Sequence, residues 1–339
     1  MTPTLPPVDA VLLLSFGGPE GPDDVMPFLE NVTRGRGIPR ERLEIVARQY
    51  MLFGGRSPIN DECRRLKAAL EGEFSTRGPS LPVYWGNRNW APMLADTVVQ
   101  MQRDGIRRAV AVATSAYSSY SACRQYLEDV ERARAAAGPQ APVIEKLAPY
   151  WNEAGFLETM IENTRAAVAA NAPAGVGDPD LRLVFTAHSL PAPMAAGCDY
   201  VAELEEASSI VAAGAAPNVP WDLVYQSRSG APSQPWLAPD IGDHLHALHA
   251  GGVTRVVVVP IGFVADHMEV VFDLDTQARA VAESLGIAMT RAACVGAAPR
   301  FVAGLRDLVV THIEGKRPPT LGSRGPRPWP CAPGCCPAR

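Results

Sequence analysis

The chain has 339 residues, of which 47% are hydrophobic and 20% charged, and its formal net charge is −5 at pH 7. This composition is typical of a globular protein with a large buried core, and the length is sufficient for two domains. The slightly acidic balance argues against a broad nucleic-acid surface, and no apolar run reaches the roughly 18 residues of a membrane span. We therefore expect neither a nucleic-acid partner nor integral membrane association.

The first apolar run, AVLLLSF at residues 10–16, follows a segment without basic residues. A secretory signal would begin with a basic region and continue with a longer apolar stretch. We therefore interpret the run as a buried strand and expect a soluble, cytoplasmic protein. In that reducing compartment disulfides are rare, and clustered cysteines more often bind a metal.

Short aliphatic runs alternate along the chain with segments of helical character. The runs expected as strands are residues 10–16, 81–86, 108–114, 181–187, 222–227 and 254–263. The helical segments include residues 39–52, 93–105 and 123–137. Continuous apolar runs are typical of parallel strands that are buried on both faces. The alternation therefore predicts an α/β fold with doubly wound parallel sheets.

A strand followed by a proline-containing turn occurs twice, as VLLLSFGGP at residues 11–19 and as RLVFTAHSLP at residues 182–191. This repeated pattern predicts two similar domains, residues 1–150 and residues 151–314. The remaining residues, 315–339, begin with a stretch rich in Pro, Gly and Arg and end in CAPGCCPAR. We expect them to form an extended C-terminal tail.

Two expected strands end in polar residues, and in open α/β sheets the chemistry lies beyond the carboxyl ends of the strands. His188 directly follows the strand at residues 181–187. A histidine in this place is suited to act as a general base, a metal ligand or a hydrogen-bonded structural residue. Its position alone leaves these alternatives open.

The second polar strand end is VPIGFVADHMEVVFDLD, residues 259–275. A helix that begins near Asp266 would place Asp266, Glu269 and Asp273 on one face. Carboxylates are costly to bury without a cation, although a solvated acidic face at a helix N-terminus is the plainer alternative. Together with His188, these carboxylates would suit a divalent transition metal or accept protons from a substrate.

Arginines and glycines alternate in a third segment, TRGRGIPR at residues 33–40. Arg34, Arg36 and Arg40 could hold carboxylates or phosphates of a ligand, or they could belong to a solvated loop. The sequence contains neither GxGxxG nor GxxxxGK[ST], so nucleotide binding is not predicted.

Five motifs follow one another along the chain: LLLSFGGPEGPDDVMPFLENVTRGRG, FGGRSPIN, FTAHSLP, YQSRSGAPSQPWLAPD and PIGFVADHMEVVFDLD. In this order they resemble the ferrochelatase family, over residues 10–313. The resemblance implies two Rossmann-like domains of the chelatase type that enclose a porphyrin cleft. It also implies insertion of Fe²⁺ into the macrocycle with release of two protons.

The resemblance assigns roles to individual residues. His188 and Glu269 would hold the Fe²⁺ and take up the pyrrole protons, while Asp266, His267 and Asp273 would guide metal or protons around them. The side chains expected to contact the porphyrin are Phe16, Arg34, Tyr50, Ser57, Tyr126 and Trp236. Many relatives have tyrosine at the position of Phe16, and its phenolate can ligate iron. Phenylalanine cannot, so axial ligation from that side is left open.

The substrate expected from the resemblance is coproporphyrin III, which carries four carboxylates. Relatives that use protoporphyrin IX at membranes have an apolar segment at the cleft lip, where this chain has Arg34, Arg36 and Arg40. We therefore expect formation of Fe-coproporphyrin III in haem b biosynthesis, with a downstream coproheme-handling enzyme as a candidate partner. The alternatives are a protoporphyrin IX ferrochelatase, a cobalt or nickel tetrapyrrole chelatase, and a non-catalytic tetrapyrrole or metal carrier.

Some ferrochelatases also carry a [2Fe–2S] cluster on one internal cysteine and three near the C-terminus. The four thiolates that such a cluster needs would here come from Cys123, Cys331, Cys335 and Cys336. The spacing C-x3-C-C departs from that of better-known relatives, and a zinc site or free thiols are the alternatives. Cys63, Cys198 and Cys294 are isolated in the sequence and are expected to be inert.

Overall fold

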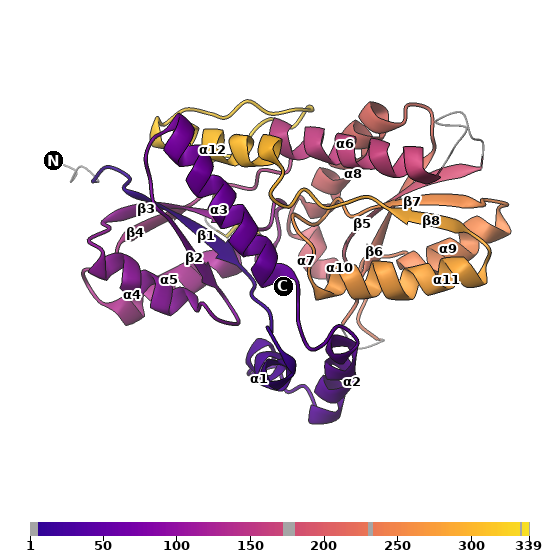
Figure 1. The fold of residues 1–339 in the computed structure, drawn as a ribbon, viewed down its shortest axis with the longest axis horizontal. Coiled ribbons are helices and arrows are strands. Elements are labelled where there is room, and N and C mark those ends of the chain that lie inside the picture. Colours follow the sequence, from indigo (N-terminus) through magenta and orange to yellow (C-terminus); the bar gives the residue numbers. More distant parts are fainter. Residues whose placement is uncertain (1–5, 172–179, 230–232, 333, 339) are drawn as a thin grey trace.

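The computed structural model describes residues 6–171, 180–229, 233–332 and 334–338. Part of the motif YQSRSGAPSQPWLAPD and two residues of the predicted tail lie outside these ranges. The described residues form two four-stranded sheets, and every strand pair in them is parallel (Figure 1). The predicted α/β fold with parallel sheets is therefore confirmed.

The first sheet has the order β2–β1–β3–β4. Its strands are β1 (Ala10–Ser15), β2 (Val83–Asn87), β3 (Arg108–Ala113) and β4 (Val143–Lys146). The register places Leu13 of β1 beside Trp85 of β2 and Val112 of β3. Strand β1 is buried along its whole length, which explains its continuous apolar run.

The second sheet has the order β6–β5–β7–β8, which repeats the order of the first. Its strands are β5 (Leu181–His188), β6 (Trp221–Gln226), β7 (Arg255–Val259) and β8 (Ala288–Arg291). The two similar sequence segments correspond to β1 and β5, which are the first strands of the two sheets along the chain. The short edge strands β4 and β8 were missed by the sequence prediction, because VIEK and AMTR have no continuous apolar run.

The helices cover the faces of the two sheets (Figure 1). Those associated with the first half are α1 (Pro22–Val32), α2 (Arg40–Met51), α3 (Ile59–Arg77), α4 (Leu94–Arg103) and α5 (Gln125–Ala137), the last preceded by a π-helical turn at Tyr120–Arg124. Those that follow are α6 (Ala154–Asn171), α7 (Ala192–Ala196), α8 (Tyr200–Ala215), α9 (Ile241–Ala250), α10 (Met268–Phe272), α11 (Arg279–Ser284) and α12 (Pro299–Ile313), with a second π-helical turn at Asp273–Ala278. No helix in the described ranges is long and apolar enough to cross a membrane.

One hydrophobic core runs through both sheets. Helix α12 packs against α3 of the first half and α6 of the second, and its Phe301 lies 6.1 Å from the ring of Tyr150 and 5.9 Å from that of Phe156. Because this core is continuous, the division into residues 1–150, 151–314 and 315–339 stays a prediction.

Helices α1 and α2 stand away from both sheets (Figure 1), and we call residues 22–53 the lip segment. Its own small core contains Phe28 and Tyr50, whose rings lie 6.0 Å apart, and it also includes Met268 and Phe272 of α10. The lip segment of the first half therefore rests on the helix of the second half that carries Glu269.

Candidate active site

His188 and Glu269, predicted to act together, are brought together by the fold. His188 is the last residue of β5, Glu269 lies in the first turn of α10, and Nε2 of the imidazole is 3.4 Å from Oε2 of the carboxylate. The two side chains are 32% and 51% exposed, so a ligand can reach both. The pair provides a nitrogen and an oxygen donor at the carboxyl end of a parallel sheet.

Gly262 allows the chain after β7 to pass close to the end of β5. A Cβ atom at this position would lie 2.6 Å from Cβ of Ala187, and the Gly262 amide donates to the carbonyl of Thr186 at 3.1 Å. Only glycine permits this approach without a shift. The close passage directs the segment from Gly262 to Glu269 toward His188.

The imidazole of His188 is held by its own backbone surroundings. Its Nδ1 lies 2.6 Å from the carbonyl of Ser189, so Nδ1–H donates there and Nε2 faces Glu269. The amide of Ser189 in turn donates to the carbonyl of Gln226 at 2.8 Å, and the Tyr200 hydroxyl donates to the carbonyl of His188 at 3.0 Å. The ring orientation is thereby fixed from two neighbouring elements, β6 and α8.

Glu269 is held by the start of its helix, which begins at Met268, two residues after the predicted start near Asp266. His267 is the N-cap residue, and its Nδ1 accepts from the amide of Glu269 at 3.2 Å. The side-chain amide of Gln226 donates to the carbonyl of Glu269 at 2.9 Å. An accepting Nδ1 requires the imidazole of His267 to be uncharged at that atom, and burial lowers the pKa of His267 accordingly.

The two catalytic candidates shift each other's pKa in opposite directions. Burial among protein atoms opposes the charge on His188, but the Glu269 carboxylate outweighs it and raises the pKa of His188 to about 9. Burial likewise opposes the charge on Glu269, and the imidazolium of His188 outweighs it and lowers the pKa of Glu269 to about 2. In the metal-free protein at neutral pH the two groups therefore form an ion pair.

The other two carboxylates of the motif have separate surroundings. Asp273 accepts a hydrogen bond from the Ser227 hydroxyl, and burial together with the charge of Glu269 raises the pKa of Asp273 to about 6. Asp266 binds the guanidinium of Arg291 through both oxygens, at 3.0 and 3.1 Å. The prediction that Asp266 shares a helix face with Glu269 and Asp273 is wrong, because Asp266 precedes the helix.

Three of the predicted porphyrin contacts lie around the end of β5 and the lip segment. The ring of Phe16 is partly exposed and lies 6.3 Å from that of Phe28. Tyr50 is buried near Glu269, and burial with the charge of that carboxylate raises the pKa of Tyr50. Trp236 pairs with Pro191 just beyond β5, and its half-buried indole has an Nε1 that finds no hydrogen-bond partner in the described ranges.

Ser57 and Tyr126, also predicted to contact the porphyrin, are both buried. Ser57 lies against Gly18, where an added Cβ would approach its Cβ to 2.7 Å. The Tyr126 ring lies under the guanidinium of Arg88, 3.9 Å from the ring centre. Neither side chain presents a free surface here, so these two contacts stay predictions.

The lip segment is both basic and apolar. Arg34 and Arg36 are exposed, whereas Arg40 pairs with Glu30 at 2.9 Å and with Glu44 at 3.5 Å. Five apolar side chains of the same segment are 37–69% exposed, namely Ile38, Ile45, Met51, Leu52 and Phe53. The prediction of a lip distinguished by its charge alone is therefore incomplete.

Five further residues that support the pair were not assigned from the sequence: Ser189, Tyr200, Gln226, Ser227 and Arg291. The sequence does carry a signal for two of them, namely their place at the end of a predicted strand. Gln226 is the last residue of the strand that pairs with β5 and stands opposite His188, and Ser227 follows it directly. Tyr200 and Arg291 act through backbone and charge contacts between distant segments, which no local pattern reveals.

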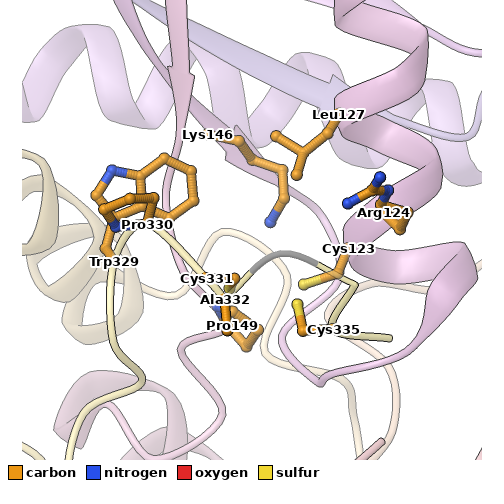
Figure 2. A pocket seen from close by; sticks show the side chains of 10 residues that line it. All are labelled: Cys123, Arg124, Leu127, Lys146, Pro149, Trp329, Pro330, Cys331, Ala332 and Cys335. Carbon is orange, nitrogen blue, oxygen red and sulfur yellow. The ribbon is translucent and has the colours of Figure 1, made fainter. Parts of the chain in front are cut away.

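Three of the four predicted cluster cysteines line one cavity of about 230 Å³ between the first sheet and the C-terminal tail. Figure 2 shows Cys123, Cys331 and Cys335 at this cavity, together with Lys146 and Trp329. The fourth cysteine, Cys336, is buried and hydrogen-bonded to Cys123. The tail thus returns to the first half of the chain and brings three thiols to the internal one.

The thiols are electrostatically coupled. The hydrogen bond from Cys336 outweighs burial, and with the charges of Lys146 and Arg327 it lowers the pKa of Cys123 to about 6. The pKa of Cys336 rises because it donates to that thiolate, and burial raises the pKa of Cys331 to about 11. One thiolate is therefore already favoured without any metal.

In the described part of the chain, no three His, Cys, Asp or Glu side chains are arranged as a ready metal site. Cys123, Cys331 and Cys335 line the first cavity, whereas Cys336 lines a second one. Cys198, isolated in the sequence and expected to be inert, lies with Cys335 and Cys336 around this second cavity of about 300 Å³, and its inertness stays a prediction. Cys63 is buried in the main core, as an inert cysteine would be.

A sequence profile described as Ferrochelatase matches residues 8–313. A coproporphyrin III ferrochelatase of Streptomyces coelicolor is 51% identical over 355 residues, which cover 98% of this chain and 94% of the relative. Another, of Mycolicibacterium smegmatis, is 51% identical over 338 residues, which cover 96% and 98%.

A solved structure agrees in fold. The sirohydrochlorin chelatase of Bacillus subtilis subspecies spizizenii, in complex with cobalt, superposes with a TM-score of 0.52. The match covers 91% of this chain and 96% of that one, at 11% sequence identity. At this identity the likeness concerns the chelatase fold and not the substrate.

Proposed function

The chain belongs to the ferrochelatase family, and on that premise we propose that it inserts Fe²⁺ into coproporphyrin III. The products are Fe-coproporphyrin III, a haem b precursor, and two protons. The observation that carries the proposal is the pair His188 and Glu269, 3.4 Å apart and accessible at the end of β5. An imidazole and a carboxylate suit a borderline divalent metal, and both also accept protons.

In the metal-free protein, His188 carries a proton on Nε2 that it shares with Glu269. Fe²⁺ that arrives at the pair displaces this proton, because metal ligation requires a neutral imidazole. When the metal passes to the ring, Nε2 and the carboxylate oxygens are free to accept the pyrrole protons. His267 and Asp273 lie next to Glu269 and relay protons outward, a role to which the pKa of Asp273, about 6, is suited. Asp266 contributes indirectly in this proposal. Its ion pair with Arg291 holds the segment that leads to Glu269.

The porphyrin lies between the lip segment and the end of β5 in this proposal. Phe16, Tyr50 and Trp236 form its apolar surroundings, and the exposed Arg34 and Arg36 bind peripheral carboxylates. The names of the two relatives above support coproporphyrin III as the substrate. Ser57 and Tyr126, both buried, are kept as proposed contacts on the resemblance alone.

Protoporphyrin IX is the second candidate substrate, and one observation favours it. The lip segment exposes Leu52 and Phe53, which suit a ring with apolar vinyl groups and fewer carboxylates. The test is an anaerobic metallation assay that offers both porphyrins at equal concentration with Fe²⁺. We expect a higher kcat/KM for coproporphyrin III, and a preference for protoporphyrin IX would refute this substrate. Parallel reactions with Co²⁺ and Ni²⁺ test the alternative chelatase activities.

We further propose that Cys123, Cys331, Cys335 and Cys336 hold a [2Fe–2S] cluster. The donor set fits, because Cys123, Cys331 and Cys335 line one cavity, Cys336 is hydrogen-bonded to Cys123, and Cys123 favours the thiolate form that ligation requires. The buried Lys146 and the nearby Arg327 offset the negative charge of four thiolates. A bound cluster would supply one-electron redox chemistry and would fasten the tail to the first half of the chain.

A reducing, cytoplasmic setting belongs to the same proposal. In such a compartment clustered cysteines more often bind a metal than form disulfides, as proposed for the four cluster cysteines. The product still carries four carboxylates, so a coproheme-handling enzyme must act after this one. Such an enzyme is the proposed downstream partner.

A further inference from the structure

The C-terminal tail brings Arg327 to a buried polar network at the start of α8. The guanidinium donates to the Ser118 hydroxyl at 2.8 Å and to the carboxylate of Asp199, and its Nε lies 3.3 Å from Oε1 of Glu203. Glu203 is 1% exposed, and a carboxylate so deeply buried needs a cation and hydrogen-bond donors. Arg327 is the cation that this network receives from the tail.

Ser118 completes the network from the first half of the chain. Its amide donates to Oε2 of Glu203 at 2.7 Å and its hydroxyl to Oε1 at 2.6 Å. The Glu203 carboxylate is therefore bound from the loop after β3 and from the tail at the same time. These contacts fix the first turn of α8 relative to both segments.

That same turn contacts the catalytic histidine. Tyr200, the first residue of α8, directly follows Asp199, and its hydroxyl donates to the carbonyl of His188 at 3.0 Å. The Tyr200 side chain is buried, and its ring lies 6.3 Å from that of Tyr117, the neighbour of Ser118. A movement of the first turn of α8 would therefore be transmitted to the backbone of His188.

We propose that Arg327 is a positioning residue for His188, acting through Asp199, Glu203 and the Tyr200 hydroxyl. The inference rests on the catalytic role proposed above for His188. It also links the cysteine tail to catalysis, because Arg327 lines one cavity with Cys198, Cys335 and Cys336. Release of the tail would remove the cation from this network and leave the first turn of α8 held by Ser118 alone.

The test compares Arg327→Gln with Arg324→Gln. Arg324 is a matched control, because it lies on the same tail and pairs with Glu206 on the same helix at 3.2 Å, without contacting Ser118 or Glu203. We expect Arg327→Gln to lower kcat for iron insertion three- to tenfold and to leave the KM for coproporphyrin III within twofold. Arg324→Gln should retain the wild-type kcat.

A double-mutant cycle separates positioning from a general loss of stability. Tyr200→Phe removes only the hydroxyl that holds His188, and we expect it to lower kcat to a similar extent. Because both changes act through one contact, the double variant should be no slower than the slower single variant. The NMR signals of the His188 ring should shift in Arg327→Gln and Tyr200→Phe and stay unchanged in Arg324→Gln.

If Arg327→Gln does not fold, Asp199→Asn removes one arm of the same network and takes its place in the cycle. Wild-type kcat in the folded variant, or losses that multiply in the double variant, would overturn the inference. Full turnover in His188→Ala would instead refute the catalytic role of His188. An inactive His188→Ala beside a fully active Arg327→Gln would refute the positioning role alone.

Discussion

The side-chain amide of Gln226 donates to the backbone carbonyl of Glu269 at 2.9 Å. The same residue accepts the amide of Ser189 through its own carbonyl, directly beside His188. Gln226 is buried, and its Oε1 has no partner within the described ranges. One residue of β6 therefore fixes the spacing of the catalytic pair from both sides.

Leucine is close to glutamine in volume, so Gln226→Leu should loosen the spacing of His188 and Glu269 without leaving a large cavity. The carbonyl of Glu269 would lose one donor and keep the Asp273 amide, so we expect a loss of about 0.5–1.5 kcal/mol in the free energy of unfolding. We expect kcat for iron insertion to fall about tenfold, since a shift of the order of 1 Å already costs about a hundredfold. Steady-state kinetics and urea unfolding measure both effects. Gln100→Leu, which removes a surface hydrogen bond to Asp104, is the control; equal kcat in the two variants would contradict the role of Gln226.

The ion pair of His188 and Glu269 predicts a distinctive pH dependence in the metal-free protein. His188 should titrate with a pKa of about 9 by NMR. In Glu269→Gln the largest attraction is gone, while burial, the Ser189 carbonyl and the charge of Asp273 remain, so the pKa of His188 should fall well below 9. A His188 signal that titrates near 6.5 in both proteins would contradict the pairing.

The stability of the metal-free protein follows from the same shifts. The raised pKa of His188 stabilises the fold fully below about pH 6.5, and this contribution is lost as the pH rises through 9. The lowered pKa of Glu269 stabilises the fold above about pH 4.5, and this contribution is lost as the pH falls toward 2. The difference in unfolding free energy between wild type and Glu269→Gln should therefore be largest near pH 5–6 and decline toward pH 9.

Gly262→Ala should destabilise the loop that carries the pair. The added Cβ would lie 2.6 Å from Cβ of Ala187 and 2.8 Å from its Cα, so backbone has to move. We expect a loss of about 1–3 kcal/mol in the free energy of unfolding, together with a lower kcat. Gly72→Ala on α3 is the matched control, because nothing lies within 4 Å of the added Cβ there and helix propensity favours alanine by about 0.5–1 kcal/mol. Equal stability of the two variants would contradict the close passage.

The cysteine proposal is tested by visible absorbance of anaerobically purified protein. Serine at Cys123, Cys331, Cys335 or Cys336 should each remove the cluster bands, since the cluster needs four thiolates. Cys198→Ser is the control, because Cys198 lines a cavity with Cys335 and Cys336 but donates to the carbonyls of Met194 and Ala195 and is not among the proposed ligands. Unchanged bands in Cys123→Ser would remove this residue from the ligand set, and lost bands in Cys198→Ser would place Cys198 in it.

The sequence was most informative where one segment decides the outcome. Buried runs such as Ala10–Ser15 predicted the central strands, and the position of His188 after a strand predicted its place at the sheet edge. The strand at residues 254–263 was predicted too long, because Pro260 ends β7 at Val259. Its apolar continuation forms the turn that contains Gly262.

What the sequence could not reveal depends on contacts between distant segments. In the sequence, Asp266 cannot be told apart from Glu269 and Asp273 as a candidate site residue. In the structure its carboxylate is paired with Arg291 on β8. Cys198 is isolated in the sequence, but in the structure it lines a cavity together with Cys335 and Cys336 of the tail. The exposure of Leu52 and Phe53 follows from how α2 rests on α10, which no periodicity encodes.

His188→Ala tests the central claim most directly, with His244→Ala as the control. His244 is also a partly buried histidine beside a carboxylate, 3.1 Å from Asp222, but it lies on α9 away from the pair. We predict that His188→Ala binds coproporphyrin III with nearly unchanged affinity and shows less than about 1% of the wild-type iron insertion rate, whereas His244→Ala remains active. Iron insertion by His188→Ala at the wild-type rate would contradict the account.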